Sequence, residues 1–226
     1  MKKLICSLLL TGIFIQLHAQ KIDFTDVSQS DQEAKAILDQ IKSNLDSYQG
    51  IEVDFDYVVI VPEEAPQKQQ GNMLVVGERY ALDLDDYGIY SDGQTVWMYD
   101  KAIEEVNINN KEENDDLLIS SPTDLLDFYL KDDFIYAFYD ELVVDGRIIT
   151  MIDFKPVDDE QEFFKIRLSV DKKRNLPAGA KLFYRDGTRI EVVFKKVSNQ
   201  SQFSDSDFIL TKEDVDSGVE FIDLRY

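Results

Sequence analysis

Cysteine and histidine are almost absent from this sequence, and their scarcity excludes several kinds of chemistry. The chain has 226 residues with one cysteine, Cys6, and one histidine, His18. Both lie near the N-terminus, where two lysines precede an apolar run over 4–15 that ends close to small residues. This layout is typical of a cleavable secretory signal peptide, and the apolar run is too short for a membrane anchor. We predict a signal peptide over 1–20 and one exported domain over 21–226.

The exported part of the chain therefore contains neither cysteine nor histidine. This composition excludes disulfides, thiolate nucleophiles, Cys/His zinc sites and Ser-His-Asp triads. A domain without disulfides must be stabilised by its hydrophobic core, and about 200 residues are enough to build one. The absence of a cysteine at the start of the exported part also argues against a lipid-anchored protein.

Basic residues are also scarce relative to acidic ones. The chain has 24 lysines and arginines against 45 aspartates and glutamates, a net charge of −21. Removal of the signal peptide takes away two lysines and no acid, which leaves −23. Phosphate groups bind clustered basic side chains, so we expect neither a nucleic-acid partner nor a surface that binds anionic membranes. A carboxylate enzyme, a binder of hard cations and a protein that binds through apolar surface remain.

The residues that are present predict one helix followed by many strands. Ser30 and Glu33 fit a capping box, and apolar residues follow at helical spacing as far as Tyr48. We therefore predict a helix over 31–48. From Ile51 the apolar period changes to two, which is typical of half-buried strands. About eleven strands are predicted, at 51–57, 73–76, 80–85, 88–90, 95–99, 104–108, 142–144, 147–154, 163–170, 180–184 and 189–197.

Three Asp-Gly pairs indicate how these strands are connected. They occur at 92–93, 145–146 and 186–187, each between two predicted strands. Asp-Gly favours the two-residue turns of β-hairpins, so the strands should form an antiparallel meander. A meander this long curls, which predicts an incomplete β-barrel rather than two stacked sheets. A short helix within 121–130 is apolar around much of its circumference and must be covered.

Several patterns resemble catalytic or metal sites, and each has a simpler interpretation. The many carboxylates could supply a glycosidase pair, but most occupy the outward parity of strands. The segment 83–88 lacks the later ligands of a calcium loop. Ser169 and Lys172 match a Ser-x-x-Lys spacing without its accompanying motifs. The basic turn at 172–174 is either a docking surface or a solvated turn. We predict no enzyme activity, no metal and no cofactor.

The segment 91–99, Ser-Asp-Gly-Gln-Thr-Val-Trp-Met-Tyr, resembles the SDGxTxWxY hairpin of the periplasmic outer-membrane lipoprotein carrier (LolA) family. The surrounding pieces occur in the family's order. They are the N-terminal helix, the strands at 71–76 and 79–84, the Ser-Pro-Thr-Asp-Leu-Leu helix at 121–126, and the closing segment 218–225. The resemblance covers most of the exported chain.

This resemblance implies an incomplete antiparallel β-barrel with helices that form a lid over an apolar cavity. The implied function is a monomeric periplasmic carrier without catalytic activity. It would receive acylated lipoproteins from an inner-membrane ABC transporter and pass them to an outer-membrane acceptor or the membrane itself. The family holds its lid with an arginine at the end of a strand. Direct register places Gly77 there, and Arg79 is the candidate substitute.

Strand parity then supplies the candidate residues. The predicted acyl cavity is lined by Val53, Phe55, Met73, Val75, Leu82, Leu84, Trp97, Tyr99, Ile166, Leu168, Val192 and Phe194, and the predicted lid contains Leu125, Leu126, Phe128 and Arg79. Two alternatives stay open. One is a lipid-binding sensor or acceptor module on the same fold, and the other is a carboxylate-dependent hydrolase.

Overall fold

The computed structural model describes residues 30–111, 128–130, 133–158 and 160–225. The predicted signal peptide and most of the predicted second helix lie outside these ranges. The strands are β1 (Ile51–Ile60), β2 (Gln67–Val76), β3 (Arg79–Leu84), β4 (Tyr87–Ser91), β5 (Thr95–Asp100), β6 (Glu105–Asn110), β7 (Phe134–Val144), β8 (Arg147–Pro156), β9 (Phe163–Asp171), β10 (Leu176–Tyr184), β11 (Arg189–Asn199) and β12 (Glu220–Asp223). The helical elements are α1 (Gln32–Leu45) and the short 3-10 helices η2 (Phe128–Leu130) and η3 (Asp205–Phe208).

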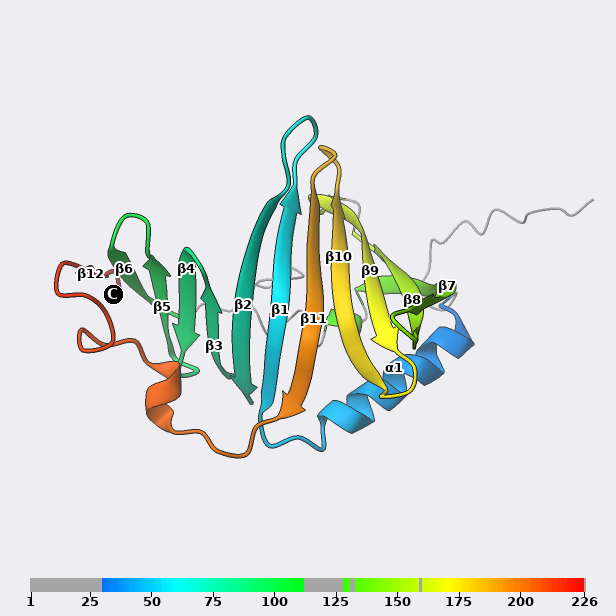
Figure 1. Cartoon of the computed structure of the whole chain (residues 1–226), viewed down its shortest axis with the longest axis horizontal. Coiled ribbons are helices and arrows are strands. Elements are labelled where there is room, and N and C mark those ends of the chain that lie inside the picture. The colour runs from blue at the N-terminus through cyan, green and yellow to red at the C-terminus, as the bar shows by residue number, and fades with distance from the viewer. Residues whose placement is uncertain (1–29, 112–127, 131–132, 159, 226) are drawn as a thin grey trace, which may run out of the picture.

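All of these strands belong to one open sheet. Its 12 strands lie in the order β12-β6-β5-β4-β3-β2-β1-β11-β10-β9-β8-β7 (Figure 1). Neighbours are antiparallel except β12, which runs parallel to β6. The edge strands β12 and β7 do not pair with each other, so the barrel is incomplete. The predicted fold class, a mostly β meander with an unclosed barrel, is confirmed.

Several strands are longer than the sequence pattern predicted, and β7 and β2 differ most. The strand predicted at 142–144 begins at Phe134 in the structure. The sequence pattern missed its first part because residues 134–139 form an apolar run without the alternation that marks a half-buried strand. The strand predicted at 73–76 begins at Gln67, and its first residues are polar. Both extensions are backbone pairings with a neighbouring strand, which local composition does not encode.

The helix α1 begins and ends inside its predicted range. Its N-cap is Asp31 rather than Ser30, because Asp31 Oδ1 accepts hydrogen bonds from the amides of Glu33 at 2.8 Å and Ala34 at 3.4 Å. The helix ends at Leu45, three residues before Tyr48. Its buried side chains recur at helical spacing and face the sheet; they are Ala34, Leu38, Ile41 and Leu45.

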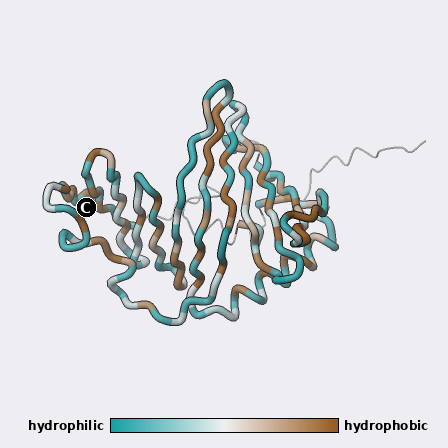
Figure 2. Tube along the Cα trace, in the orientation of Figure 1, coloured by the Kyte–Doolittle hydropathy of each residue, from teal (hydrophilic) through white to brown (hydrophobic). Residues whose placement is uncertain are grey.

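The Asp-Gly turns are confirmed as hairpin connections. Gly93, Gly146 and Gly187 have φ values of 95°, 76° and 98°. These values lie in the left-handed region, which glycine reaches without a steric penalty. Figure 2 shows the alternation of hydrophilic and hydrophobic residues along the strands that these turns connect.

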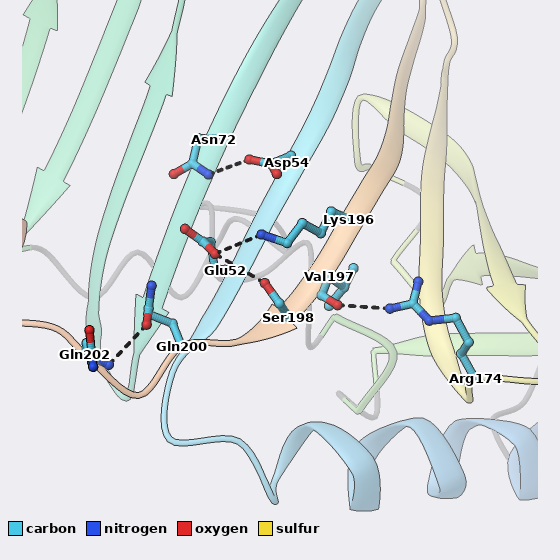
Figure 3. Close-up of polar contacts among 9 residues, drawn as sticks. All are labelled: Glu52, Asp54, Asn72, Arg174, Lys196, Val197, Ser198, Gln200 and Gln202. Carbon is cyan, nitrogen blue, oxygen red and sulfur yellow. Dashed lines mark hydrogen bonds and ion pairs between the residues drawn. The ribbon is translucent and has the colours of Figure 1, made fainter.

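One face of the central strands is polar. Asn72 Nδ2 donates to Asp54 Oδ1 at 2.8 Å, and Ser198 Oγ donates to Glu52 Oε2 at 3.2 Å (Figure 3). Lys196 Nζ lies 3.5 Å from the same glutamate oxygen. We call this side of the sheet the outer face. The apolar side chains of the same strands point to the opposite side, which we call the inner face.

Candidate functional site

The inner face is defined by pairs of residues that lie opposite each other on neighbouring strands. Val53 pairs with Met73, and Met73 pairs with Leu82. On the other side of β1, Phe55 pairs with Phe194. Paired residues point to the same face of a sheet, so these side chains form one continuous apolar surface. Alternation along each strand placed them there, as the sequence predicted.

One half of the inner face is covered. Strands β7–β11 carry buried side chains that pack with α1 and η2 in one hydrophobic cluster, which continues onto β1–β3 through Val53, Phe55, Met73, Val75 and Tyr80. Phe128 is buried within this cluster, with its ring centroid 5.0 Å from that of Phe154 and 5.7 Å from that of Phe134. Of the predicted cavity residues, four belong to this covered half: Ile166, Leu168, Val192 and Phe194.

The other half of the inner face is more open. Val53, Phe55, Met73 and Val75 are buried, but Leu82, Leu84 and Ile89 further toward β4 and β5 are only partly buried. The cross-strand pairs Met73–Leu82, Leu82–Ile89 and Ile89–Met98 carry the apolar surface outward to β5. The partly exposed apolar residues of this half include Leu82, Leu84, Ile89 and Met98.

The structure places Trp97 and Tyr99 on the outer face, which corrects their predicted parity. Trp97 pairs with Tyr90 and with Ile108, whereas the inner-face residue of the same strand is Met98. Trp97 is buried in a second cluster, where side chains of the C-terminal segment pack against it; the members are Trp97, Val106 and Leu210, with Tyr90, Tyr99, Ile108, Ile209, Val215, Val219 and Phe221 against them. The parity was ambiguous because every residue from 96 to 99 is apolar.

Arg79 also lies on the outer face. It pairs with Val76 across the turn between β2 and β3, one residue from the inward-facing Tyr80. Its guanidinium contacts η3, with Nη1 2.6 Å from Asp205 Oδ1 and Cζ 4.7 Å from the ring centroid of Phe208. Leu125 and Leu126 lie outside the described residues, so a latch between Arg79 and that segment stays a prediction.

Two tyrosines add polar groups to the apolar inner face. Tyr57 lies opposite Val192, two residues from Phe55 and with the same parity. Burial raises the pKa of Tyr57, and burial together with the nearby Tyr57 raises the pKa of Tyr184. Nearby, Gln69 Oε1 is buried without a hydrogen-bond partner. The sequence analysis did not predict polar groups on the inner face, although the strand parity of Tyr57 indicated that its side chain points to that face.

The carboxylates of β1 and β3 gather on the outer face. They line an open cleft of about 620 Å³ together with Asn72 and Lys195. Asp56 Oδ2 lies 2.6 Å from Lys195 Nζ, and Asp83 Oδ1 accepts a hydrogen bond from Tyr90 at 2.7 Å. Among the described residues, no group of three or more His, Cys, Asp or Glu side chains could hold a metal ion.

The arrangement of one open sheet with an apolar face can be compared with known proteins. The family model of the outer membrane lipoprotein carrier protein LolA matches residues 46–211. The chain belongs to the LolA family. The resemblance drawn from residues 91–99 is thereby confirmed. No curated protein sequence matches this LolA-family chain significantly.

Several solved structures are similar to this chain, and the first of them has the same fold. An uncharacterized conserved protein from Thermus thermophilus has a TM-score of 0.55 and 9% identity, over 85% of this chain and 99% of the other. A putative outer membrane lipoprotein-sorting protein domain from Vibrio parahaemolyticus has a TM-score of 0.43 and 11% identity, over 76% and 94%. The Mycobacterium tuberculosis lipoprotein LppX has a TM-score of 0.45 and 11% identity, over 76% and 99%.

Membership of the LolA family supports a lipoprotein-binding, carrier-type role. Proteins of this family are binding and carrier proteins rather than enzymes. Within the described ranges, no helix is long and apolar enough to cross a membrane.

Proposed function

We propose that this protein is a periplasmic carrier that binds the acyl chains of lipoproteins against its inner face. The observation that carries the proposal is the division of that face. One half is closed by α1 and η2, and the other half presents partly exposed apolar side chains on β3–β5. A straight acyl chain fits such a surface because it needs apolar contact and no specific polar partner.

The energetics favour a loose site. Each methylene transferred from water contributes about 0.8 kcal/mol, so a sixteen-carbon chain gains roughly 12 kcal/mol in total. A membrane offers the same gain, and a carrier must release its cargo into one. Partial exposure of Leu82 and Leu84 is suited to this task, because an incompletely enclosed chain is held less tightly than one in a closed cavity.

A fluorescent fatty-acyl probe tests the binding step. The purified chain should bind the probe, and Leu84→Asp should weaken binding by about tenfold because it places a charge on the inner face. The matched control is Leu74→Asp, since Leu74 is a partly buried leucine that faces outward on the adjacent strand β2. Leu126→Asp tests the predicted lid in the same assay. Equal probe affinity in Leu84→Asp and Leu74→Asp contradicts the proposed site.

Lipoprotein release from spheroplasts tests the transport step. The proposal includes a cleavable signal peptide, an inner-membrane ABC transporter as donor, and an outer-membrane acceptor or the membrane as recipient. Added wild-type protein should appear in a soluble complex with released lipoprotein, and Leu84→Asp should release less. If release is independent of this protein and of its inner face, the shuttle is excluded even where probe binding persists.

A further inference from the structure

The hairpin between β7 and β8 ends in a group of exposed apolar side chains, which we call the apolar tip. Its members are Leu142, Val143, Val144 and Ile148, exposed by 46%, 74%, 43% and 43%. They surround the Asp145-Gly146 turn at the end of the sheet opposite β12 (Figure 1). Soluble proteins rarely leave adjacent large apolar residues this open without a partner.

The fold places basic side chains next to this tip. The turn between β9 and β10 carries Lys172 and Lys173, both exposed. The amide of Lys172 donates to the carbonyl of Ile148 at 3.0 Å, so the turn is held directly beside the tip. Lys172 Nζ lies 2.6 Å from Glu141 Oε2. The exposed side chain of Arg147 adds a third cation, with its Nη1 4.0 Å from Oδ2 of the buried Asp171. Sequence positions about 30 residues apart thus form one surface.

The direction of the apolar side chains decides what kind of partner fits. Leu142 and Val144 share one face of the hairpin, and Val143 points to the other. A protein surface that docks on one face would leave the other apolar face in water. The interfacial layer of a bilayer instead surrounds a hairpin on both faces. Cations beside an apolar insertion then lie at the level of the lipid phosphates.

The net charge of the whole chain restricts any contact with an anionic bilayer to a local basic surface. A net charge of −21 repels an anionic bilayer, so attraction must come from a surface where cations are concentrated. Lys173 is the most suitable residue for a test. Arg174, by comparison, is committed to the fold because its Nη2 donates to the carbonyl of Val197 at 3.1 Å (Figure 3).

We propose that the apolar tip and the adjacent basic turn dock this protein on a bilayer containing anionic phospholipids. The tip inserts among the lipid headgroups, and Lys172 and Lys173 contact their phosphates. This contact is separate from the inner face and does not depend on acyl binding there.

Vesicle flotation tests the contact, with vesicles of phosphatidylcholine alone or mixed with phosphatidylglycerol. Wild type should bind the mixed vesicles more tightly. Val143→Asp should weaken this binding by about tenfold or more, because the tip then carries a charge. Ile103→Asp is the matched control, since Ile103 is an exposed aliphatic residue in the distant β5–β6 turn.

Charge variants separate the basic turn from the apolar tip. Lys173→Gln should weaken binding to the mixed vesicles about fivefold and leave binding to pure phosphatidylcholine unchanged. Asp145→Asn should strengthen binding to the mixed vesicles by a similar factor, a gain that misfolding cannot produce. Lys68→Glu, on the distant β1–β2 side, should have no comparable effect.

Two results overturn the proposal. One is a wild-type protein that does not float with mixed vesicles. The other is a Val143→Asp variant that floats as wild type does, which would leave a protein as the partner of the tip. Val143→Asp should retain its affinity for the acyl probe, so failure of membrane docking is distinguishable from failure of acyl binding.

Discussion

Arg79 Nη1 lies 2.6 Å from Asp205 Oδ1, and this ion pair joins the start of β3 to η3. The same guanidinium lies over the ring of Phe208, which is fully buried, whereas the side chain of Asp205 is 93% exposed. Exposed ion pairs contribute little because water screens them, so the ring contact should carry most of the stabilisation. Arg79 therefore anchors the C-terminal segment to the outer face.

Substitutions at the two ends of this pair should differ in cost. Arg79→Ala should lower the free energy of unfolding by about 1–2 kcal/mol, because it removes the contact with Phe208 and the packing of the arginine stem. Asp205→Asn should cost less than about 0.5 kcal/mol. Urea unfolding measures both. Equal losses would show that the ion pair, rather than the ring, holds the segment.

Gly71 is required by the packing of the inner face. A Cβ at this position would overlap the ring of Phe55 and would lie 2.9 Å from Leu84 Cδ2. Gly71→Ala should therefore destabilise the protein by about 1–3 kcal/mol through overpacking, measured by thermal unfolding.

Gly77 supplies the control for this substitution. It has a φ of 60° and nothing within 4 Å of its Cβ position, so Gly77→Asn should be tolerated. A Gly71→Ala variant as stable as Gly77→Asn would contradict the close packing of Phe55 on β2.

The single tryptophan reports on the outer face. Trp97 is covered by Leu210 and other side chains of the C-terminal segment. Leu210→Asp should shift its fluorescence emission to longer wavelength, because a buried charge cannot remain in that cluster and water then reaches the indole. An acyl ligand on the inner face should leave the emission maximum of the wild type unchanged. A ligand-induced shift as large as that of Leu210→Asp would place the ligand on the outer face and contradict the proposed acyl site.

Partly buried tyrosines predict a loss of stability in alkali. Burial raises the pKa values of Tyr57, Tyr87, Tyr90 and Tyr184 above their ordinary value of 10, and a hydrogen bond to Asp83 adds to the effect at Tyr90. The native state thus holds these protons more tightly than the unfolded state does. Their contribution is fully present below pH 10 and is lost as the pH rises above that value.

Tyr90→Phe isolates the largest of these effects. Between pH about 9 and about 11, the variant should lose less unfolding free energy than wild type, because one raised pKa is removed. Urea unfolding at the two pH values gives the difference, and phenolate absorbance follows the titration itself. An identical pH dependence would show that Tyr90 titrates as freely in the folded protein as in the unfolded chain.

Local chemistry made much of this fold predictable. The period change at Ile51 placed the first strand, and its alternation correctly oriented Val53 and Phe55 toward the inner face. The Asp-Gly pairs marked three hairpins because few other residues tolerate a positive φ. The segment 91–99 identified the family from side chains at fixed spacing. Each of these signals acts over a few residues, and a sequence displays such signals directly.

Other features depended on tertiary structure. The side of the sheet chosen by Trp97 was ambiguous in an apolar run, and only pairing with Tyr90 decided it. The contact between Arg79 and Asp205 joins residues 126 positions apart. The basic turn came to lie beside the apolar tip because β8 and β9 are neighbours in the sheet. The sequence by itself determined periods, turns and charge; the pairing of strands, a long-range backbone interaction, decided which of those side chains meet.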